Sequence, residues 1–156
     1  MTVLFVCTGN SCRSIMAEGL LKRYLKEKGR DDINVISAGT GALSGYSPTA
    51  NTIEVMKKEG VDVSGHKTAL VTEKMIRQAD LILVMEKAHK EEIIDRVPDA
   101  VGKTFLLTEF KKDPGDRPRL GEDVLDPMGR PLKDYAYTLM TIKKEIERIT
   151  PHLLKS

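Results

Sequence analysis

The chain has 156 residues, of which 40% are hydrophobic, and its 25 basic side chains nearly balance 23 acidic ones. A net charge of +2 excludes the strong basic field of most nucleic-acid-binding domains, so we expect no nucleic-acid partner. No apolar run approaches the length of a membrane span and residues 1–30 lack a signal-peptide pattern, so we expect no membrane contact and a cytoplasmic location.

Four short apolar segments predict β-strands, because each is rich in Val, Ile, Leu or Phe, as strands buried on both faces are. Helical patterns separate them along the chain. This alternation predicts an α/β fold in which a four-stranded parallel sheet is flanked by helices in three layers, joined by right-handed crossovers. We expect a single domain over residues 1–156. The predicted strands are Thr2–Val6, Ile33–Ser37, Leu81–Met85 and Thr104–Leu107.

Five segments show helical spacing. A short one is expected to be capped by Thr72 and to run to Gln78, and another covers Glu86–Arg96. The strongest lies near the C-terminus and is expected to end at Pro151, with Lys143, Lys144 and Arg148 pointing outward. Its predicted buried face consists of Leu132, Tyr135, Ala136, Leu139, Ile142, Ile146 and Ile149. The two remaining helices are marked by Ala17, Leu20, Leu21 and Tyr24, and by Ile53 and Met56.

Two segments lack periodicity. Gly39–Pro48 follows the second predicted strand, and Lys112–Pro131 contains twenty residues with four prolines and three glycines. Long structureless segments inside a compact domain are usually functional. Loops at the carboxyl ends of parallel strands build the ligand site, so we expect Gly39–Pro48 and the opening loop to lie together.

The opening loop is Cys7-Thr8-Gly9-Asn10-Ser11-Cys12-Arg13-Ser14, between the first strand and the first helix. Backbone N–H groups of such a loop, together with the helix dipole, form an anion site. Gly9 is expected to provide backbone conformations closed to other residues, and Asn10 to tolerate a left-handed one. Arg13 presents a planar fork that suits two oxygens of a tetrahedral oxyanion. The loop is therefore predicted to bind phosphate.

Cys7 is expected at the bottom of this cradle, with a hydrogen bond from Ser14. Free cysteine is only a few per cent ionised at neutral pH, and helix N-termini and cationic neighbours favour the thiolate. An ionised thiol in a phosphate-sized cradle indicates in-line attack on phosphorus, giving a cysteinyl-phosphate that water cleaves. Asp126, in Asp-Pro-Met-Gly, is the predicted acid for the leaving group and base for water. No metal or cofactor is required, because the protein supplies the charge stabilisation.

Each residue alone has a simpler interpretation. A lone cysteine is usually a small buried hydrophobe, and Asp126 alone resembles an ordinary turn residue. A nucleotide-binding P-loop is excluded, because the loop ends in Cys-Arg-Ser without Gly-Lys. The combination Cys-x5-Arg-Ser at a strand-to-helix turn favours catalysis.

At these residues the sequence resembles the low-molecular-weight protein tyrosine phosphatase family, whose signature is V-C-x-G-N-x-C-R-S. Matching segments extend over essentially the whole chain: Val6–Ser14, Met16–Glu18, Ser37–Thr40, Ala79–Asp80 and Asp123–Pro127. The resemblance implies a Rossmann-like four-stranded sheet with Cys7 as nucleophile, Arg13 as phosphate clamp and Asp126 as general acid.

The same resemblance implies supporting roles around the loop. Asn10 and Ser37 would hold it by hydrogen bonds, and Ser14 would tune the thiolate, while Thr8, Gly9 and Ser11 belong to the substrate-binding loop. Cys12 resembles a neighbouring thiol that can trap an oxidised nucleophile as a reversible disulfide. The alternative for Cys12 is an inert, half-buried thiol.

The departures from the family concern the substrate. Tyrosine-specific members usually carry Ile at the position of Ser11 and aromatic residues after Asp-Pro, where this chain has Met128 and Gly129. Bacterial protein arginine phosphatases resemble this chain in a small hydroxyl residue at the position of Ser11 and in D-V-L-D-P. We therefore expect phosphoarginine on a protein partner, with inorganic phosphate as product. Phosphotyrosine is the alternative, with Tyr46 as its aromatic wall.

Two other activities fit the same scaffold. One is a thiol-cofactor-dependent arsenate reductase, since the chain has no cysteine after Cys12 for an intramolecular relay. The other is a non-enzymatic phosphoprotein-binding module, which would not need Cys7, Arg13 and Asp126 together.

The remaining candidates are assigned structural roles. The three histidines lie far apart in the sequence and are expected on the surface, with no metal ligand among them: His66, His89 and His152. Three methionines are expected in the core: Met75, Met85 and Met140. Four basic residues are expected on a solvated loop face: Lys111, Lys112, Arg117 and Arg119.

Overall fold

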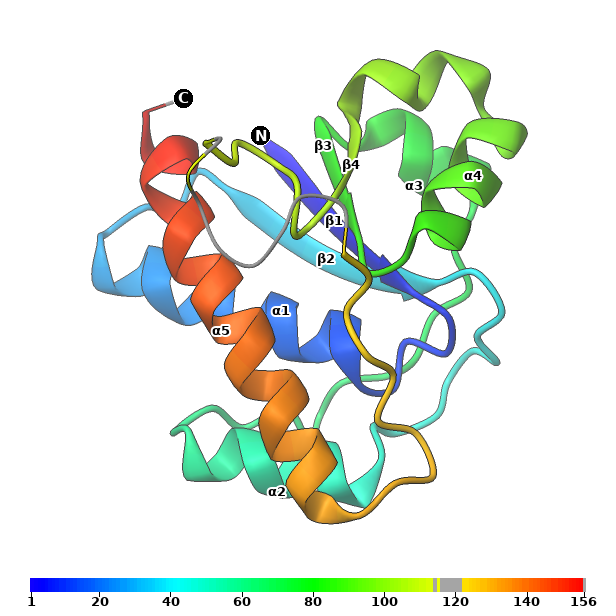
Figure 1. Ribbon diagram of the computed structural model, residues 1–156. Helices are drawn as coiled ribbons and strands as arrows, with labels where there is room; N and C mark the ends of the chain where they lie inside the picture. Colours follow the sequence, from blue (N-terminus) through cyan, green and yellow to red (C-terminus); the bar gives the residue numbers. More distant parts are fainter. Residues whose placement is uncertain (114, 116–121, 156) are drawn as a thin grey trace.

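The computed structural model describes residues 1–113, 115 and 122–155. Four parallel strands form one sheet, as predicted, and the structure gives their order as β2-β1-β3-β4 (Figure 1). The register pairs Cys7 with Gly39, so the end of β1 adjoins the end of β2. Each strand lies within two residues of its predicted bounds: β1 (Thr2–Cys7), β2 (Asn34–Gly39), β3 (Leu81–Val84) and β4 (Thr104–Leu106).

Helices cover both faces of the sheet, and this confirms the three-layer α/β architecture (Figure 1). All five predicted helices are present, and a short 3-10 helix at Pro98–Lys103 precedes β4. Thr72 caps its helix as expected, with its hydroxyl accepting from the Met75 N–H. The helices are α1 (Arg13–Glu27), α2 (Ala50–Lys58), α3 (Glu73–Gln78), α4 (Lys87–Arg96) and α5 (Leu132–Leu154).

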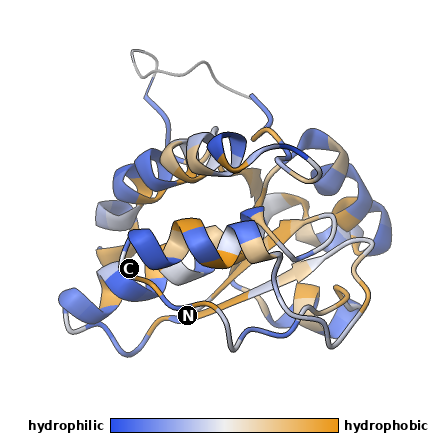
Figure 2. Cartoon of the chain, turned by 90° about the horizontal axis from the view of Figure 1, so that it is seen from below, coloured by the Kyte–Doolittle hydropathy of each residue, from blue (hydrophilic) through white to orange (hydrophobic). Residues whose placement is uncertain are grey.

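The side chains of β1 alternate between the two faces of the sheet and so contribute to two separate core layers. Val3 and Phe5 pack with apolar residues of α1, α2 and α5, whereas Leu4 and Val6 pack with those of α3 and α4. All four side chains are fully buried, and each such burial contributes about 1.5–3 kcal/mol. Figure 2 shows the hydrophobic strands between helices whose outward faces are hydrophilic. β1 is therefore held on both sides, and its last residue is fixed in place.

Three expectations about α5 are wrong. The helix does not end at Pro151 but continues to Leu154, because the buried Leu153 keeps the last turn on the core. Ala136 is exposed, although most of the predicted face is buried. Met140 is also exposed rather than in the core, while Met85 is fully buried as expected.

An ion cluster corrects two further expectations. Arg148 does not point outward: its guanidinium contacts Glu145 at 2.6 Å and donates to the carbonyl oxygens of Phe110 and Leu107. Lys112 is not solvated either, because its buried ammonium lies 3.3 Å from the Glu145 carboxylate. Lys111 is exposed as expected. Arg117 and Arg119 lie outside the described residues. Within the described part of the chain, no helix is long and apolar enough to cross a membrane.

Candidate active site

The opening loop lies at the carboxyl edge of the sheet, between Cys7 at the end of β1 and Arg13 at the start of α1. A hydrogen bond links the loop to the segment that follows β2: the Thr40 N–H donates to the Cys7 carbonyl oxygen at 2.9 Å. Gly39 makes this approach sterically allowed. A Cβ added at Gly39 would overlap the Thr8 carbonyl oxygen and lie 2.9 Å from the Asn10 nitrogen. Glycine is therefore needed at position 39 for close contact and not for a left-handed backbone.

Asn10 is the internal support of the loop. It is fully buried with φ of 52°, which confirms the expected left-handed backbone. Its side-chain amide donates to Ser14 Oγ at 2.8 Å and to Ser37 Oγ at 2.9 Å. Its Oδ1 accepts from the Ala69 N–H and from His66 Nε2, each at 3.0 Å. The expected hydrogen bond between Asn10 and Ser37 is thus present, and every polar atom of this amide has a partner.

The expectation for Gly9 is wrong. Gly9 is not among the glycines with positive φ, and a Cβ there would meet only Ser11 Oγ, at 3.2 Å. The unusual backbone conformation in the loop belongs to Asn10 instead.

Cys7 and Ser14 form the buried centre of the site. Both are at most 2% exposed, and Cys7 Sγ lies 2.9 Å from Ser14 Oγ. Because Ser14 Oγ already accepts a hydrogen bond from Asn10, its own proton is available for the sulfur. A hydrogen bond donated by a hydroxyl to sulfur stabilises the thiolate relative to the thiol. The two atoms lie at hydrogen-bond distance, as expected, and donation from Ser14 to a Cys7 thiolate stays a prediction.

The N-terminus of α1 adds to the positive field near the sulfur. Its N-cap residue, Cys12, gives no side-chain cap, and its first turn contains no acidic residue. The free N–H groups of a helix N-terminus carry partial positive charge and bind anions. The loop backbone and the helix end can therefore act together on one anion.

Arg13 is a buried cation with three partners from other segments. It is 2% exposed, and its Nη1 donates to Glu86 Oε2 at 2.6 Å and to the Val124 carbonyl oxygen at 2.8 Å. Its Nη2 lies 3.6 Å from Asp126 Oδ2. A buried charge is tolerated only when it is paired and hydrogen-bonded in this way. Sequence reasoning missed Glu86, although an acid directly after the third strand at the ligand edge was a usable signal.

His89 corrects the expectation that all three histidines are on the surface. It is 3% exposed, and its Nδ1 accepts from the Glu86 N–H at 3.1 Å. The proton of the neutral ring is therefore on Nε2, which donates to Thr8 Oγ1 at 2.8 Å. Burial, followed by the charge of Arg13, lowers the pKa of His89 and keeps it neutral. Glu86 and His89, at the start of α4, thus hold both the guanidinium and the second residue of the loop.

Asp126 reaches Arg13 from the segment that precedes α5. Its carboxylate is 49% exposed, and Oδ1 accepts from the Met128 N–H at 3.1 Å, while Oδ2 faces Arg13. Two hydrogen bonds hold the backbone that precedes Asp126. The Val124 N–H donates to the Met85 carbonyl oxygen at 2.8 Å. The Thr138 hydroxyl donates to the Leu125 carbonyl oxygen at 3.2 Å. Of the predicted trio, Asp126 and Arg13 are therefore in contact, and Cys7 lies at the other end of the loop that leads into Arg13.

Ser11 and Cys12 differ in their exposure to solvent. Ser11 is partly exposed and lines a hollow of ≈ 270 Å³ with Gly9, Leu43 and Tyr46, the last of which is 62% exposed. Cys12 is 2% exposed and unbridged, and its sulfur lies 3.6 Å from Thr49 Oγ1. Ser11 can meet a substrate, whereas the Cys12 sulfur is covered.

Comparisons with known proteins identify the family of the chain. A family model described as low molecular weight phosphotyrosine protein phosphatase matches residues 2–156. The chain is 38% identical over 152 residues to the probable low molecular weight protein-tyrosine-phosphatase EpsP of Ralstonia nicotianae, covering 97% of this chain and 95% of that protein. It is 32% identical over 151 residues to the protein-arginine-phosphatase of Geobacillus stearothermophilus, covering 97% and 95%.

A solved structure is similar over the whole fold. It is a mutant of the YwlE arginine phosphatase with a phosphorylated active-site serine, with a TM-score of 0.90 and 31% identity, covering 100% of this chain and 97% of that one. The proteins to which this chain is similar are named phosphatases, which are hydrolases. The match over residues 2–156 and the shared four-stranded architecture leave one assignment: this chain belongs to the low molecular weight phosphotyrosine protein phosphatase family.

Proposed function

We propose that this protein hydrolyses a phosphorylated side chain of a protein substrate, without a metal, through a cysteinyl-phosphate on Cys7. The observation that supports the proposal is the contact of the Asp126 carboxylate with the Arg13 guanidinium, at the end of the loop that begins with the buried Cys7. The domain that performs this chemistry spans residues 1–156.

In the first step, loop N–H groups and Arg13 hold the phosphoryl oxygens. Because Nη1 of Arg13 is occupied by Glu86 and Val124, we assign Nη2, which lies 3.6 Å from Asp126 Oδ2, as the donor to the phosphoryl oxygens. The Cys7 thiolate attacks phosphorus, an S–P bond forms, and the bond from phosphorus to the side chain breaks. Asp126 gives its proton to the departing atom, so no strongly basic group leaves unprotonated.

In the second step, the ionised Asp126 takes a proton from water as that water attacks phosphorus. The S–P bond breaks, and inorganic phosphate and the Cys7 thiolate are released. Ser14 donates its hydrogen bond to the sulfur in both steps, which makes sulfur a better leaving group. The phosphorylated serine named for the YwlE mutant supports a phosphoryl group carried by the active-site nucleophile.

For the substrate, we favour phosphoarginine. The partly exposed Ser11 hydroxyl and the half-exposed Asp126 carboxylate offer polar contacts that suit a guanidinium, and Met128 stands where an aromatic wall would favour a phenyl ring. A relative named protein-arginine-phosphatase matches 97% of the chain. Tyr46 favours the second candidate, phosphotyrosine, because its exposed ring lines the hollow beside Ser11.

The test is a side-by-side measurement of kcat/KM on peptides that differ only in phosphoarginine or phosphotyrosine. We expect phosphoarginine to be preferred by about tenfold or more, which corresponds to about 1.4 kcal/mol of transition-state stabilisation. A higher value for phosphotyrosine would reverse the substrate proposal. Binding of both peptides without turnover would instead indicate a phosphoprotein-binding module, and thiol-dependent reduction of arsenate without peptide hydrolysis would indicate an arsenate reductase.

Ser11→Ile sharpens this test. It removes the hydroxyl and adds apolar surface, so we expect the ratio of kcat/KM values to move toward phosphotyrosine. The matched control is Ser47→Ile, at an exposed serine lining the same hollow. If both variants shift the ratio equally, the Ser11 hydroxyl does not determine specificity.

A further inference from the structure

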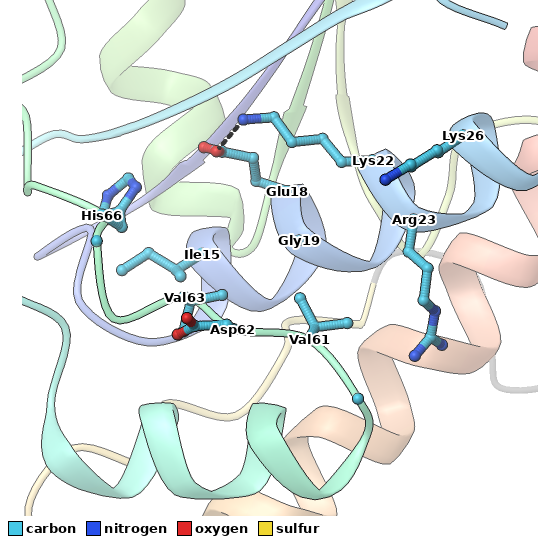
Figure 3. Close-up of a pocket in the computed structure, with 12 residues that line it drawn as sticks. Ile15, Glu18, Gly19, Lys22, Arg23, Lys26, Val61, Asp62, Val63 and His66 are labelled. Atoms are coloured by element: carbon cyan, nitrogen blue, oxygen red, sulfur yellow. Dashed lines mark hydrogen bonds and ion pairs between the residues drawn. The ribbon is translucent and has the colours of Figure 1, made fainter.

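A second cavity, of ≈ 600 Å³, lies between α1 and the segment that follows α2, and the Cys7 sulfur is not part of its lining. Figure 3 shows Ile15, Val61 and Val63 between the helix and this segment, with Glu18, Lys22 and Lys26 along the helix. The volume lies within the range of about 300–1,000 Å³ that is usual for small-molecule sites. The cavity therefore combines an apolar floor with charged walls.

The charges of the lining indicate the sign and size of a ligand's charge. Three cations of α1 outnumber the two carboxylates of the lining: Lys22, Arg23 and Lys26 against Glu18 and Asp62. The Glu59 carboxylate that engages Arg23 is also paired with Lys143, so one positive charge remains in excess. Burial lowers the pKa of His66, so this residue adds no charge at neutral pH. A single negative charge balances such a cavity, whereas a phosphate dianion would overcompensate it.

The three cations differ in how firmly they are held. Arg23 is engaged by the Glu59 carboxylate at 3.4 Å, and Lys22 contacts Glu18 at 2.7 Å while remaining 55% exposed. For the Lys26 ammonium, no ion pair or hydrogen bond occurs among the residues that the structure describes. Exposed pairs contribute at most about 1 kcal/mol, so an incoming carboxylate can take Lys22 and Lys26 at little cost.

Two lining residues also support the catalytic loop. Glu18 Oε1 accepts from the Ser37 hydroxyl at 2.6 Å, and His66 Nε2 donates to Asn10 Oδ1 at 3.0 Å. Ser37 Oγ in turn accepts from the Asn10 amide, which also donates to Ser14. A continuous chain of hydrogen bonds thus runs from the cavity wall to the residue that contacts the Cys7 sulfur.

We propose that this cavity is an effector site for a small organic monocarboxylate. Its apolar body would lie on Ile15, Val61 and Val63, its carboxylate would bind Lys22 and Lys26, and its occupancy would be sensed at Cys7 through Glu18. The predicted effect on the reaction rate rests on the proposed phosphatase function. The prediction that the cavity binds a monocarboxylate does not depend on it.

The coupling has a definite direction. Lys22 and Ser37 are the two partners of the Glu18 carboxylate, one on each oxygen. A ligand that captures Lys22 leaves Glu18 held only by Ser37, which loosens the support of Asn10 and Ser14. We expect kcat to fall with KM unchanged, by about fivefold at saturation, the low end of typical coupling between sites.

The experiment uses 1-naphthoate as the probe and 1-naphthamide as its uncharged control. In a ¹⁵N NMR titration, naphthoate should shift the amides of Gly19, Val61 and Val63 together with the Asn10 side-chain amide, and naphthamide should not. With p-nitrophenyl phosphate as substrate, naphthoate should lower kcat and leave KM unchanged. If the protein shows no turnover, only the phosphatase proposal is refuted. The NMR shifts then still test whether naphthoate binds in the cavity and whether binding affects Asn10.

Lys26→Gln tests the carboxylate contact. Its basal kcat should equal that of the unmodified protein, and its affinity for naphthoate should fall about fivefold, the upper value for an exposed ion pair. Lys28→Gln is the matched control, because it removes the same charge from an exposed residue outside the cavity. Three results would overturn the proposal: cavity amides that do not shift, inhibition through KM alone, or equal losses in the two variants.

Discussion

The two halves of the proposed active site are built differently. The loop half is interior: Cys7, Asn10 and Ser14 are at most 2% exposed, and their side chains are hydrogen-bonded to one another. The acid half is at the surface, where Asp126 is 49% exposed and is held by one backbone N–H and a longer contact to Arg13. A phosphate cradle must be rigid to bind the transition state, whereas a group that exchanges protons must reach water. Arg13 directly follows the loop in the chain, and its guanidinium contacts Val124 and Asp126 of the acid half, so it links the two halves.

The largest effect is expected when the proposed nucleophile is removed from the rigid half. Cys7→Ser should lower turnover of p-nitrophenyl phosphate by about 10⁴-fold or more, because the alcohol is hardly ionised at neutral pH. Fold and anion binding should persist, since the hydrogen bonds of Asn10 do not involve the sulfur. Rates, circular dichroism and sulfate binding measure these outcomes. Activity near that of the unmodified protein would exclude the covalent intermediate.

The acid half should be next in size. Asp126→Ala should lower hydrolysis of substrates with poor leaving groups by about 10²–10⁴-fold, with a smaller loss for p-nitrophenyl phosphate, whose leaving group needs little protonation. The measurement is a series of aryl phosphates with graded leaving groups. Glu122→Ala, at an exposed carboxylate on the same segment, is the control. Equal slowing across the series would remove Asp126 from the acid role.

The connection between the halves can be broken at Glu86. Glu86→Ala should leave a buried donor of Arg13 without its charged partner, which costs about 1–3 kcal/mol and about 10–100-fold in kcat/KM. Glu86→Gln keeps an acceptor and should retain more of both. Denaturant unfolding and phosphatase rates measure the two variants. If Glu86→Ala behaves like the unmodified protein, Val124 and Asp126 suffice to orient the guanidinium.

The smallest expected effect concerns pH and His89. Because the pKa of His89 is lowered in the folded state, the unfolded chain binds more protons below about pH 6.5, and stability should fall as pH decreases from there. His66, whose pKa is lowered mainly by burial, contributes in the same direction. His89→Gln keeps a donor for Thr8 and should flatten the profile of unfolding free energy between pH 7 and 5. Parallel profiles for the two proteins would show that His89 does not titrate in this range.

Local sequence predicted the loop because Cys7, Asn10 and Ser14 lie within eight residues, and a strand-to-helix turn brings such side chains together. The contacts of Asn10 with His66 and Ala69 are long-range, and they were not predicted. Glu86 and His89 were missed because their contacts with Arg13 and Thr8 span more than seventy residues and depend on the register of β1 with β3. On α5, helical periodicity identified the core face but placed Arg148 outward, since it does not show the free carbonyl oxygens of Phe110 and Leu107 that attract the guanidinium.

Gly39 has a practical consequence for laboratory evolution of this enzyme. Its backbone passes so close to Thr8 and Asn10 that even a methyl group has no room. In a selection for activity from a library randomised at this codon, glycine should dominate the survivors, and the few alanine clones should have acquired second changes that reshape the neighbouring chain. Efforts to redirect substrate choice therefore have more freedom at the exposed Leu43 and Tyr46 than at the start of the same loop.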